Sequence, residues 1–187
     1  MSKIADRGVT YEDLLDVPEQ FVAEIVEGEL FTSPRPAPRH AEANGSLYAQ
    51  LRRRFQDGDG GPGGWWIVIE PELHLAGDAL VPDIGGWRKE RLLRLPETAW
   101  FEVAPDWICE VVSVKTARLD RIRKLPRYAR HGIPHAWVVD PVAKSAEIYR
   151  LVSGHWSLFE THEGITMIRA EPFDGADIDL GALWIEP

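Results

Sequence analysis

Two short apolar segments on either side of a helical stretch constrain the fold most. Residues 107–113 and 136–140 are rich in β-branched and aromatic side chains, which predicts two buried strands. Between them, residues 117–131 repeat apolar side chains at helical spacing, and Gly132 with Pro134 ends the predicted helix. Strands that alternate with helices in this way indicate a mixed α/β fold with a mixed sheet.

Other segments add further strands and a second long helix. Thr10 is typical of a helix cap, Glu27 next to Gly28 predicts a hairpin turn within residues 21–31, and Pro38 can begin a helix. That helix is expected to end before a glycine-rich loop at 57–64. By the same residue preferences, extended segments are expected at 65–70, 72–75 and 81–87, and they should form one central sheet with 107–113. Antiparallel strands are expected at 147–151, 156–160 and 165–169.

Length and composition set the broad class. A chain of 187 residues fits one domain spanning 1–187, and the lone Cys109 cannot form an internal disulfide and is expected to be a small buried hydrophobe. No run of eighteen apolar residues and no signal-like start appear, so we expect a cytoplasmic protein with no membrane contact. Tryptophans are numerous, and those at 65, 66, 87, 100 and 107 can form the core, a substrate wall or a dimer face.

The charge distribution leaves two interpretations open. A formal net charge of −9 argues against a surface built mainly for sequence-independent binding of nucleic acid. Basic residues nevertheless cluster at 52–54, 88–94 and 115–130. Each cluster is either part of a basic patch or an ordinary solvated face.

Two acidic residues lie in extended segments that are predicted to be buried, where an ionised carboxylate is unfavourable without a partner. Asp83 follows Val81 and Pro82, and Glu110 stands between Cys109 and Val111 in an apolar run. A buried ionised carboxylate costs several kcal/mol unless it is paired or binds a metal. Carboxylates from two neighbouring strands suit Mg²⁺ or Mn²⁺, which keep several water ligands.

The second predicted helix presents a lysine to the same region. Asp120, Lys124 and Tyr128 are spaced by four residues and therefore share one helix face. An ammonium beside a metal-bound water would orient the nucleophile and offset charge on a phosphoryl group. The alternative is a plain helix ion pair between Asp120 and Lys124.

The order and spacing of these residues resemble the Uma2 family of restriction endonucleases. The residues that carry the resemblance are Glu24-Ile-Val-Glu-Gly28-Glu29-Leu, Ser33-Pro34, His40, Pro82-Asp83, Pro105-Asp106-Trp-Ile-Cys-Glu110-Val-Val-Ser113, Asp120, Lys124, Tyr128, Gly132, Pro134 and Trp137-Val-Val-Asp140-Pro141. The resemblance spans roughly residues 21–150 and places the chain in the PD-(D/E)XK nuclease superfamily.

The resemblance implies a restriction-endonuclease-like fold, with a mixed central β-sheet flanked by helices and additional antiparallel strands, and a homodimer that acts on DNA. It implies that Asp83, Glu110 and the Val111 carbonyl bind the metal and that Lys124 takes the role of the superfamily lysine, since Val112 stands where that lysine usually does. Glu24 is the expected further metal-site carboxylate or general base. Residues expected on the substrate side are His40, Ser113, Asp120 and Tyr128.

Two departures bear on activity. The turn at 113–116 has the sequence Ser-Val-Lys-Thr, where the family commonly shows Ser-Pro-Ser-Thr. Pro126 falls inside the predicted helix, where it removes a hydrogen bond and can direct Lys124 toward the metal site or away from it. The predicted function is Mg²⁺- or Mn²⁺-dependent hydrolysis of DNA. The alternatives are a catalytically inactive nuclease-fold protein that binds or regulates, and a hydrolase of small ligands.

Overall fold

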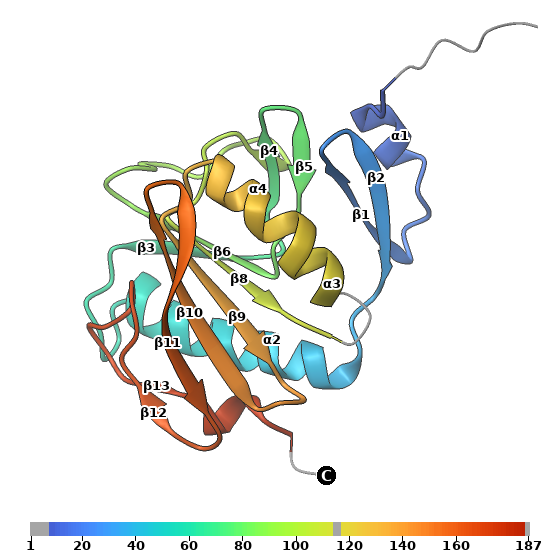
Figure 1. Cartoon of the computed structure of the whole chain (residues 1–187). Helices are drawn as coiled ribbons and strands as arrows, with labels where there is room; N and C mark the ends of the chain where they lie inside the picture. The colour runs from blue at the N-terminus through green and yellow to red at the C-terminus, as the bar shows by residue number, and fades with distance from the viewer. Residues whose placement is uncertain (1–7, 114–116, 186–187) are drawn as a thin grey trace, which may run out of the picture.

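The computed structural model describes residues 8–113 and 117–185 and contains two large β-sheets (Figure 1). The six-stranded sheet has the order β11-β10-β9-β8-β6-β3. Its strands are β3 (Trp65–Ile69), β6 (Ile84–Arg88), β8 (Trp107–Val111), β9 (His135–Asp140), β10 (Ser145–Val152) and β11 (His155–Glu163). The five-stranded sheet has the order β2-β1-β5-β4-β7, with β1 (Phe21–Val26), β2 (Glu29–Pro34), β4 (Glu72–Leu75), β5 (Asp78–Leu80) and β7 (Trp100–Phe101). A separate pair is formed by β12 (Met167–Ile168) and β13 (Ile178–Asp179).

The strand that carries Glu110 lies inside the six-stranded sheet. β8 runs parallel to β9 and antiparallel to β6, so the sheet is mixed. All five residues of β8 are buried. Because side chains alternate along a strand, Cys109 and Val111 face one side of the sheet and Ile108 and Glu110 face the other.

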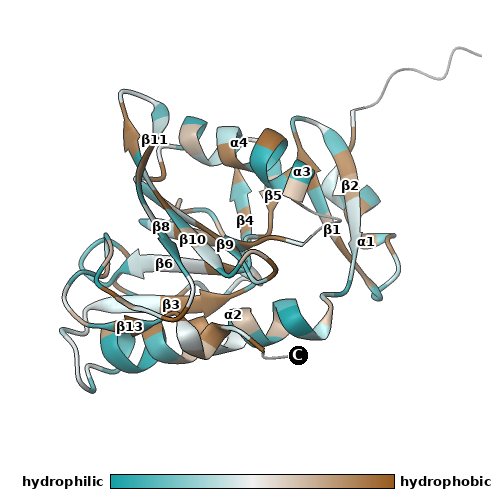
Figure 2. Cartoon of the chain, turned by 60° about the horizontal axis from the view of Figure 1, so that its bottom comes forward, coloured by the Kyte–Doolittle hydropathy of each residue, from teal (hydrophilic) through white to brown (hydrophobic). Residues whose placement is uncertain are grey.

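One face of this sheet is covered by α2 (Pro38–Leu51), as Figures 1 and 2 show. The helix is coloured in alternating hydrophobic and hydrophilic segments in Figure 2, as expected when one face is buried. Its core side chains are Ala43, Leu47 and Leu51, which pack with Cys109 and Val111 of β8. The predicted helix from Pro38 is thus confirmed, and it continues into a π-helical turn at Arg52–Gln56.

The opposite face is covered by the second predicted helix and by the five-stranded sheet. This helix consists of α3 (Ala117–Leu119), a π-helical turn (Asp120–Lys124) and α4 (Leu125–Arg130). Leu125 and Tyr128 pack with Ile108 of β8 and with Leu73 and Leu80 of the five-stranded sheet. The space between the two sheets is therefore filled from the helix as well as from both sheets.

Pro126 does not end the helix. It stands near the start of α4, directly after the wider π-helical turn that carries Lys124. A proline cannot donate to the preceding turn, and a π-helical turn is one of the local changes that accommodate this. The consequence is that the lysine lies on a locally altered turn of an otherwise continuous helix.

Several strand predictions need correction. Residues 72–75, predicted in the central sheet, form β4 of the five-stranded sheet, and residues 165–169 contribute only to the separate β12–β13 pair. Strands β5 and β7 were not predicted, and they are only 3 and 2 residues long. The capped helix α1 (Tyr11–Leu15) and the hairpin turn at Glu27 and Gly28 are confirmed, with positive φ of 56° and 77° in the turn.

Burial decides the open questions about single residues. Cys109 is buried in the core as predicted. Of the tryptophans whose place the sequence left open, Trp65, Trp87 and Trp107 are buried in the core. Trp66 is partly buried against the core. Within residues 8–113 and 117–185, no helix is both long and apolar enough to cross a membrane.

Candidate active site

A pocket of about 420 Å³ opens where the two sheets, α2 and the lysine-bearing helix meet. It collects residues that are far apart in the sequence. Its charged and polar lining includes Glu24, Arg35, Arg39, His40, Glu70, Asp83, Glu110, Ser113, Asp120 and Lys124. The pocket thus brings together most of the site residues that the sequence predicts.

Glu110 faces the helix because it lies on the same side of β8 as Ile108. Its Oε1 accepts a hydrogen bond of 2.6 Å from the Tyr128 hydroxyl and lies 2.9 Å from Lys124 Nζ. Tyr128 lines no part of the pocket and is fully buried. The tyrosine therefore holds Glu110 in place from the core side.

Lys124 joins the two sheets at the floor of the site. Its Nζ lies 2.9 Å from Oε1 of Glu24 on β1 and donates to the Val81 carbonyl oxygen at 2.9 Å. Asp120 Oδ1, one turn earlier, is 3.8 Å from the same nitrogen. The side chain is 4% exposed, so this ammonium is directed at Glu24 and Glu110 and not at solvent.

Asp83 lies immediately before β6, beside the strand that carries Glu110. Its Oδ2 accepts a hydrogen bond of 2.7 Å from the Val111 backbone N–H, and its Oδ1 is 3.2 Å from Nε2 of His40. Ile84 pairs with Cys109 in the antiparallel β6–β8 pair. The next positions along the two strands, Asp83 and Glu110, are therefore neighbours where the strands end.

Burial and crowding of acids perturb the ionisation of the site. Desolvation by burial raises the pKa of the Glu110 carboxyl well above its usual range. The charge of Lys124 opposes this shift, and the charges of Asp120, Asp83 and Glu24 add to it. For Lys124, burial lowers the pKa, but the charges of Glu110 and Glu24 outweigh it and raise the pKa well above its usual value. One ammonium thus faces an excess of carboxylates.

These residues fit a magnesium-type cation. In the part of the chain that the structure describes, no three His, Cys, Asp or Glu side chains already form a metal-binding cluster. Mg²⁺, however, is commonly held by one or two carboxylates with several waters. Asp83 and Glu110 line the pocket and supply hard oxygen donors, and a divalent cation would offset the excess negative charge beside Glu110. Val111, whose carbonyl the resemblance implies as a further ligand, does not itself line the pocket.

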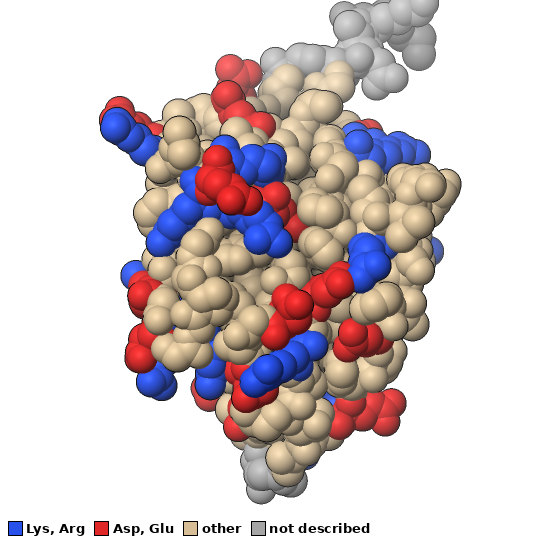
Figure 3. Space-filling view, turned by 90° about the vertical axis from the view of Figure 1, so that its left-hand side faces the viewer, with Lys and Arg blue, Asp and Glu red and all other residues tan. Residues whose placement is uncertain are grey.

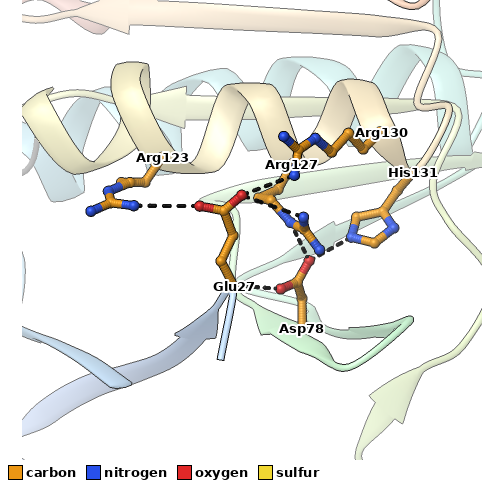
Figure 4. A network of polar contacts seen from close by, with 6 residues as sticks. All are labelled: Glu27, Asp78, Arg123, Arg127, Arg130 and His131. Atoms are coloured by element: carbon orange, nitrogen blue, oxygen red, sulfur yellow. Dashed lines mark hydrogen bonds and ion pairs between the residues drawn. The ribbon is translucent and has the colours of Figure 1, made fainter. Parts of the chain in front are cut away.

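A second network, outside the pocket, fixes the helix against the five-stranded sheet (Figure 4). Glu27, in the β1–β2 turn, lies 2.9 Å from Arg130 and 3.5 Å from Arg127. Asp78 accepts from the Glu27 N–H at 2.9 Å and from Arg127 Nε at 2.7 Å, and lies 2.7 Å from His131 Nε2. This network holds β1, which carries Glu24, against the helix that carries Lys124.

Asp78→Asn is expected to lower the free energy of unfolding by about 2–4 kcal/mol at pH 7, because Arg127 loses a buried carboxylate partner. Burial alone would raise the Asp78 pKa. Its hydrogen bonds with His131, the Glu27 N–H and Arg127 have the larger combined effect, so the pKa lies below the ordinary 3.8. The stabilisation is therefore complete above pH 3.8 and is lost as the pH falls through the lower folded pKa.

Urea denaturation of both proteins at pH 7 and near pH 2 measures this difference. Asp59→Asn is the matched control, since it removes a carboxylate from an exposed pair with Arg53 and should change stability much less. A gap between Asp78→Asn and the unmodified protein that stays equally large at low pH would contradict the assignment.

The structure places the predicted site residues as follows. Those that line the pocket are Glu24, His40, Asp83, Glu110, Ser113, Asp120 and Lys124. Tyr128, expected on the substrate side, is fully buried, does not line the pocket and contacts Glu110 from the core. The turn at 113–116 differs in sequence from the family, and its residues 114–116 lie outside the described residues.

Sequence reasoning missed Arg35, Arg39 and Glu70, which also line the pocket. The signal for the first two was present, since Arg35 lies between two prolines before α2 and Arg39 stands in the first turn of α2, next to His40. Glu70 gave no such signal. It follows β3 with a positive φ of 45°, and its N–H donates to the Asp83 carbonyl oxygen at 2.9 Å.

Comparisons with known proteins agree with the fold and show the family. A search of curated proteins finds no match. The fold is similar to the crystal structure of a protein from Anabaena variabilis described as "a putative nuclease belonging to DUF820", with a TM-score of 0.74 and 19% identity over 94% of this chain and 97% of that one. Residues 10–181 match the family Uma2, described as "Putative restriction endonuclease". Because that match covers most of the sequence, the chain belongs to the Uma2 family.

Proposed function

We propose that this protein is a nuclease that hydrolyses phosphodiester bonds in DNA and uses Mg²⁺ or Mn²⁺ as its cofactor. The observation that carries the proposal is the position of Lys124, whose Nζ lies 2.9 Å from both Glu110 and Glu24 in the pocket that Asp83 lines. A lysine directed away from the acids would instead have favoured an inactive protein.

The helix supplies the lysine that the strand lacks. A lysine at position 112 would project from β8 on the same side as Glu110, because the two positions are two residues apart. Val112 occupies that position and lines the pocket together with Lys124. Lys124 therefore supplies an ammonium on the side of β8 where the superfamily lysine would stand.

Each residue then has a role in the proposed hydrolysis. Asp83, Glu110 and the Val111 carbonyl would hold the ion, which when bound supplies an activated water and neutralises phosphoryl charge. Lys124 orients the attacking water and offsets negative charge on the phosphoryl oxygens. Glu24 positions Lys124, and the Tyr128 hydroxyl orients Glu110.

A DNA substrate has support from the pocket rim and not from the overall charge. Arg35 and Arg39 are exposed at the pocket and can contact phosphates on either side of the scissile bond. The predicted basic clusters elsewhere contain ion pairs, such as Arg53 with Asp59 at 2.6 Å and Arg91 with Asp106 at 2.9 Å. On the face in Figure 3, basic and acidic side chains are interspersed. The homodimer that the family resemblance implies stays a prediction.

A plasmid-nicking assay in Mg²⁺ and in Mn²⁺ tests the proposal. We expect nicking by the unmodified protein, none above background in EDTA, and loss of nicking in Asp83→Ala. Asp174→Ala, at an exposed position that does not line the pocket, should nick like the unmodified protein. Absence of nicking by a metal-loaded protein would refute the nuclease proposal and favour a binding module or a different substrate.

A further inference from the structure

His40 is a buried histidine whose side chain faces the candidate active site. It lies in the first turn of α2, is 8% exposed and lines the same pocket as Asp83. Its Nε2 is 3.2 Å from Asp83 Oδ1, and its ring also interacts with the Val111 carbonyl. A nitrogen donor thus stands beside two of the expected metal ligands.

Hydrogen bonding leaves this histidine incompletely explained. Nδ1 is buried and has no hydrogen-bond partner among residues 8–113 and 117–185. Buried polar atoms in folded proteins nearly always have a partner. Nδ1 is a different atom from Nε2, the nitrogen that faces Asp83. The described residues therefore contain no hydrogen-bond network that holds both sides of the ring for purely structural reasons.

The spacing of the donors matches adjacent ligands of one ion. Two ligands at about 2.1 Å from an ion and at right angles to each other are about 3 Å apart. The Asp83 Oδ1 to His40 Nε2 distance is 3.2 Å. Glu110 is already bound by Tyr128 and Lys124 of the lysine-bearing helix, whereas His40 reaches Asp83 from α2.

We propose that His40 is a direct ligand of the metal that Asp83 holds, and that it makes the site prefer Mn²⁺ to Mg²⁺. The inference rests on the proposed metal centre and adds its selectivity. Imidazole nitrogen is a good ligand for transition-metal ions, whereas Mg²⁺ favours oxygen donors and retains its water reluctantly. His40 would then be part of the metal centre and not a contact for substrate.

Isothermal titration of Mn²⁺ and Mg²⁺ into matched variants tests the preference. We expect His40→Ala to weaken Mn²⁺ binding by at least about tenfold and Mg²⁺ binding by less than about threefold. The control is His162→Ala, since His162 pairs with Glu160 on β11 and does not line the pocket. Equal weakening for both ions, or none, would overturn the proposal.

Pulsed electron paramagnetic resonance of the Mn²⁺-loaded protein tests the bond directly, and its main measurement is made on the unmodified protein. Protein labelled with ¹⁵N-histidine should show a histidine nitrogen coupled to Mn²⁺, and His40→Ala should remove that coupling. Bound Mn²⁺ without nitrogen coupling would overturn the role of His40. If both ions bind the unmodified protein without nitrogen coupling and Asp83→Ala abolishes their binding, the metal centre stands without His40. If neither ion binds the unmodified protein, the proposed function fails as well.

Discussion

Lys124→Met is expected to lower the free energy of unfolding by about 3–5 kcal/mol at pH 7. Methionine keeps much of the length of the side chain and removes the charge. Glu24 and Glu110, whose side chains are 5% and 2% exposed, then lose their buried cation. A buried carboxylate without a partner is far more costly than the pair was favourable, so the loss exceeds that for a surface ion pair.

Urea denaturation of Lys124→Met measures this loss, and a second substitution tests its cause. Glu24 keeps a hydrogen bond from the Val81 N–H and Glu110 keeps one from the Tyr128 hydroxyl, but both acids lack a cation in this variant. Adding Glu24→Gln removes one of the two charges and should restore part of the stability. Lys89→Met is the matched control, because Lys89 makes its hydrogen bond to the Gln56 carbonyl outside the pocket and should have a smaller effect. A loss below about 1 kcal/mol, or no recovery in the double variant, would show that Lys124 is not the main partner of these acids.

Phe173→Ala is expected to lower the free energy of unfolding by about 3–5 kcal/mol. Phe173 is fully buried, and its ring lies between 4.7 and 5.7 Å from the rings of Phe55, Trp65, Trp107 and Trp137. Alanine would leave a cavity among large rings that cannot easily move inward, and the aromatic contacts would be lost as well.

The matched control for Phe173 is Phe159→Ala. The Phe159 side chain is 50% exposed on β11, beside Arg150, and its removal should cost about 1 kcal/mol or less. Comparable losses for the two variants in thermal or urea denaturation would contradict the role of Phe173 as a tightly packed core side chain.

Local patterns in the sequence predicted much of the fold. The helix from Pro38, the helix from Ala117 and the strands β8 and β9 have strong periodicity or continuous apolar runs, and their types are confirmed. The assignment of residues 72–75 to the central sheet was wrong, because strand pairing depends on contacts between distant segments. Strands β5 and β7 were too short to produce a pattern.

In the candidate site, too, local patterns were predictable from the sequence and contacts between distant segments were not. Helical spacing predicted that Asp120, Lys124 and Tyr128 share one helix face, and the family resemblance implied that Lys124 reaches the acids. The contact of Tyr128 with Glu110 was not predicted, since Tyr128 was expected on the substrate side. The network that places Glu27 and Asp78 against the helix was not predictable, since Glu27 and Asp78 are 51 residues apart and β5 was not recognised. Pro126 could not be resolved from the sequence either, because whether a proline breaks a helix depends on the packing around it.

Isothermal titration of Mg²⁺ into the unmodified protein and into Asp83→Ala tests the central claim most directly. The proposed metal centre predicts saturable binding of the ion to the unmodified protein and loss of that binding in Asp83→Ala, while urea denaturation shows that the variant remains folded. Failure of the unmodified protein to bind either Mg²⁺ or Mn²⁺, or equal binding by Asp83→Ala, would contradict a metal centre built on Asp83 and Glu110.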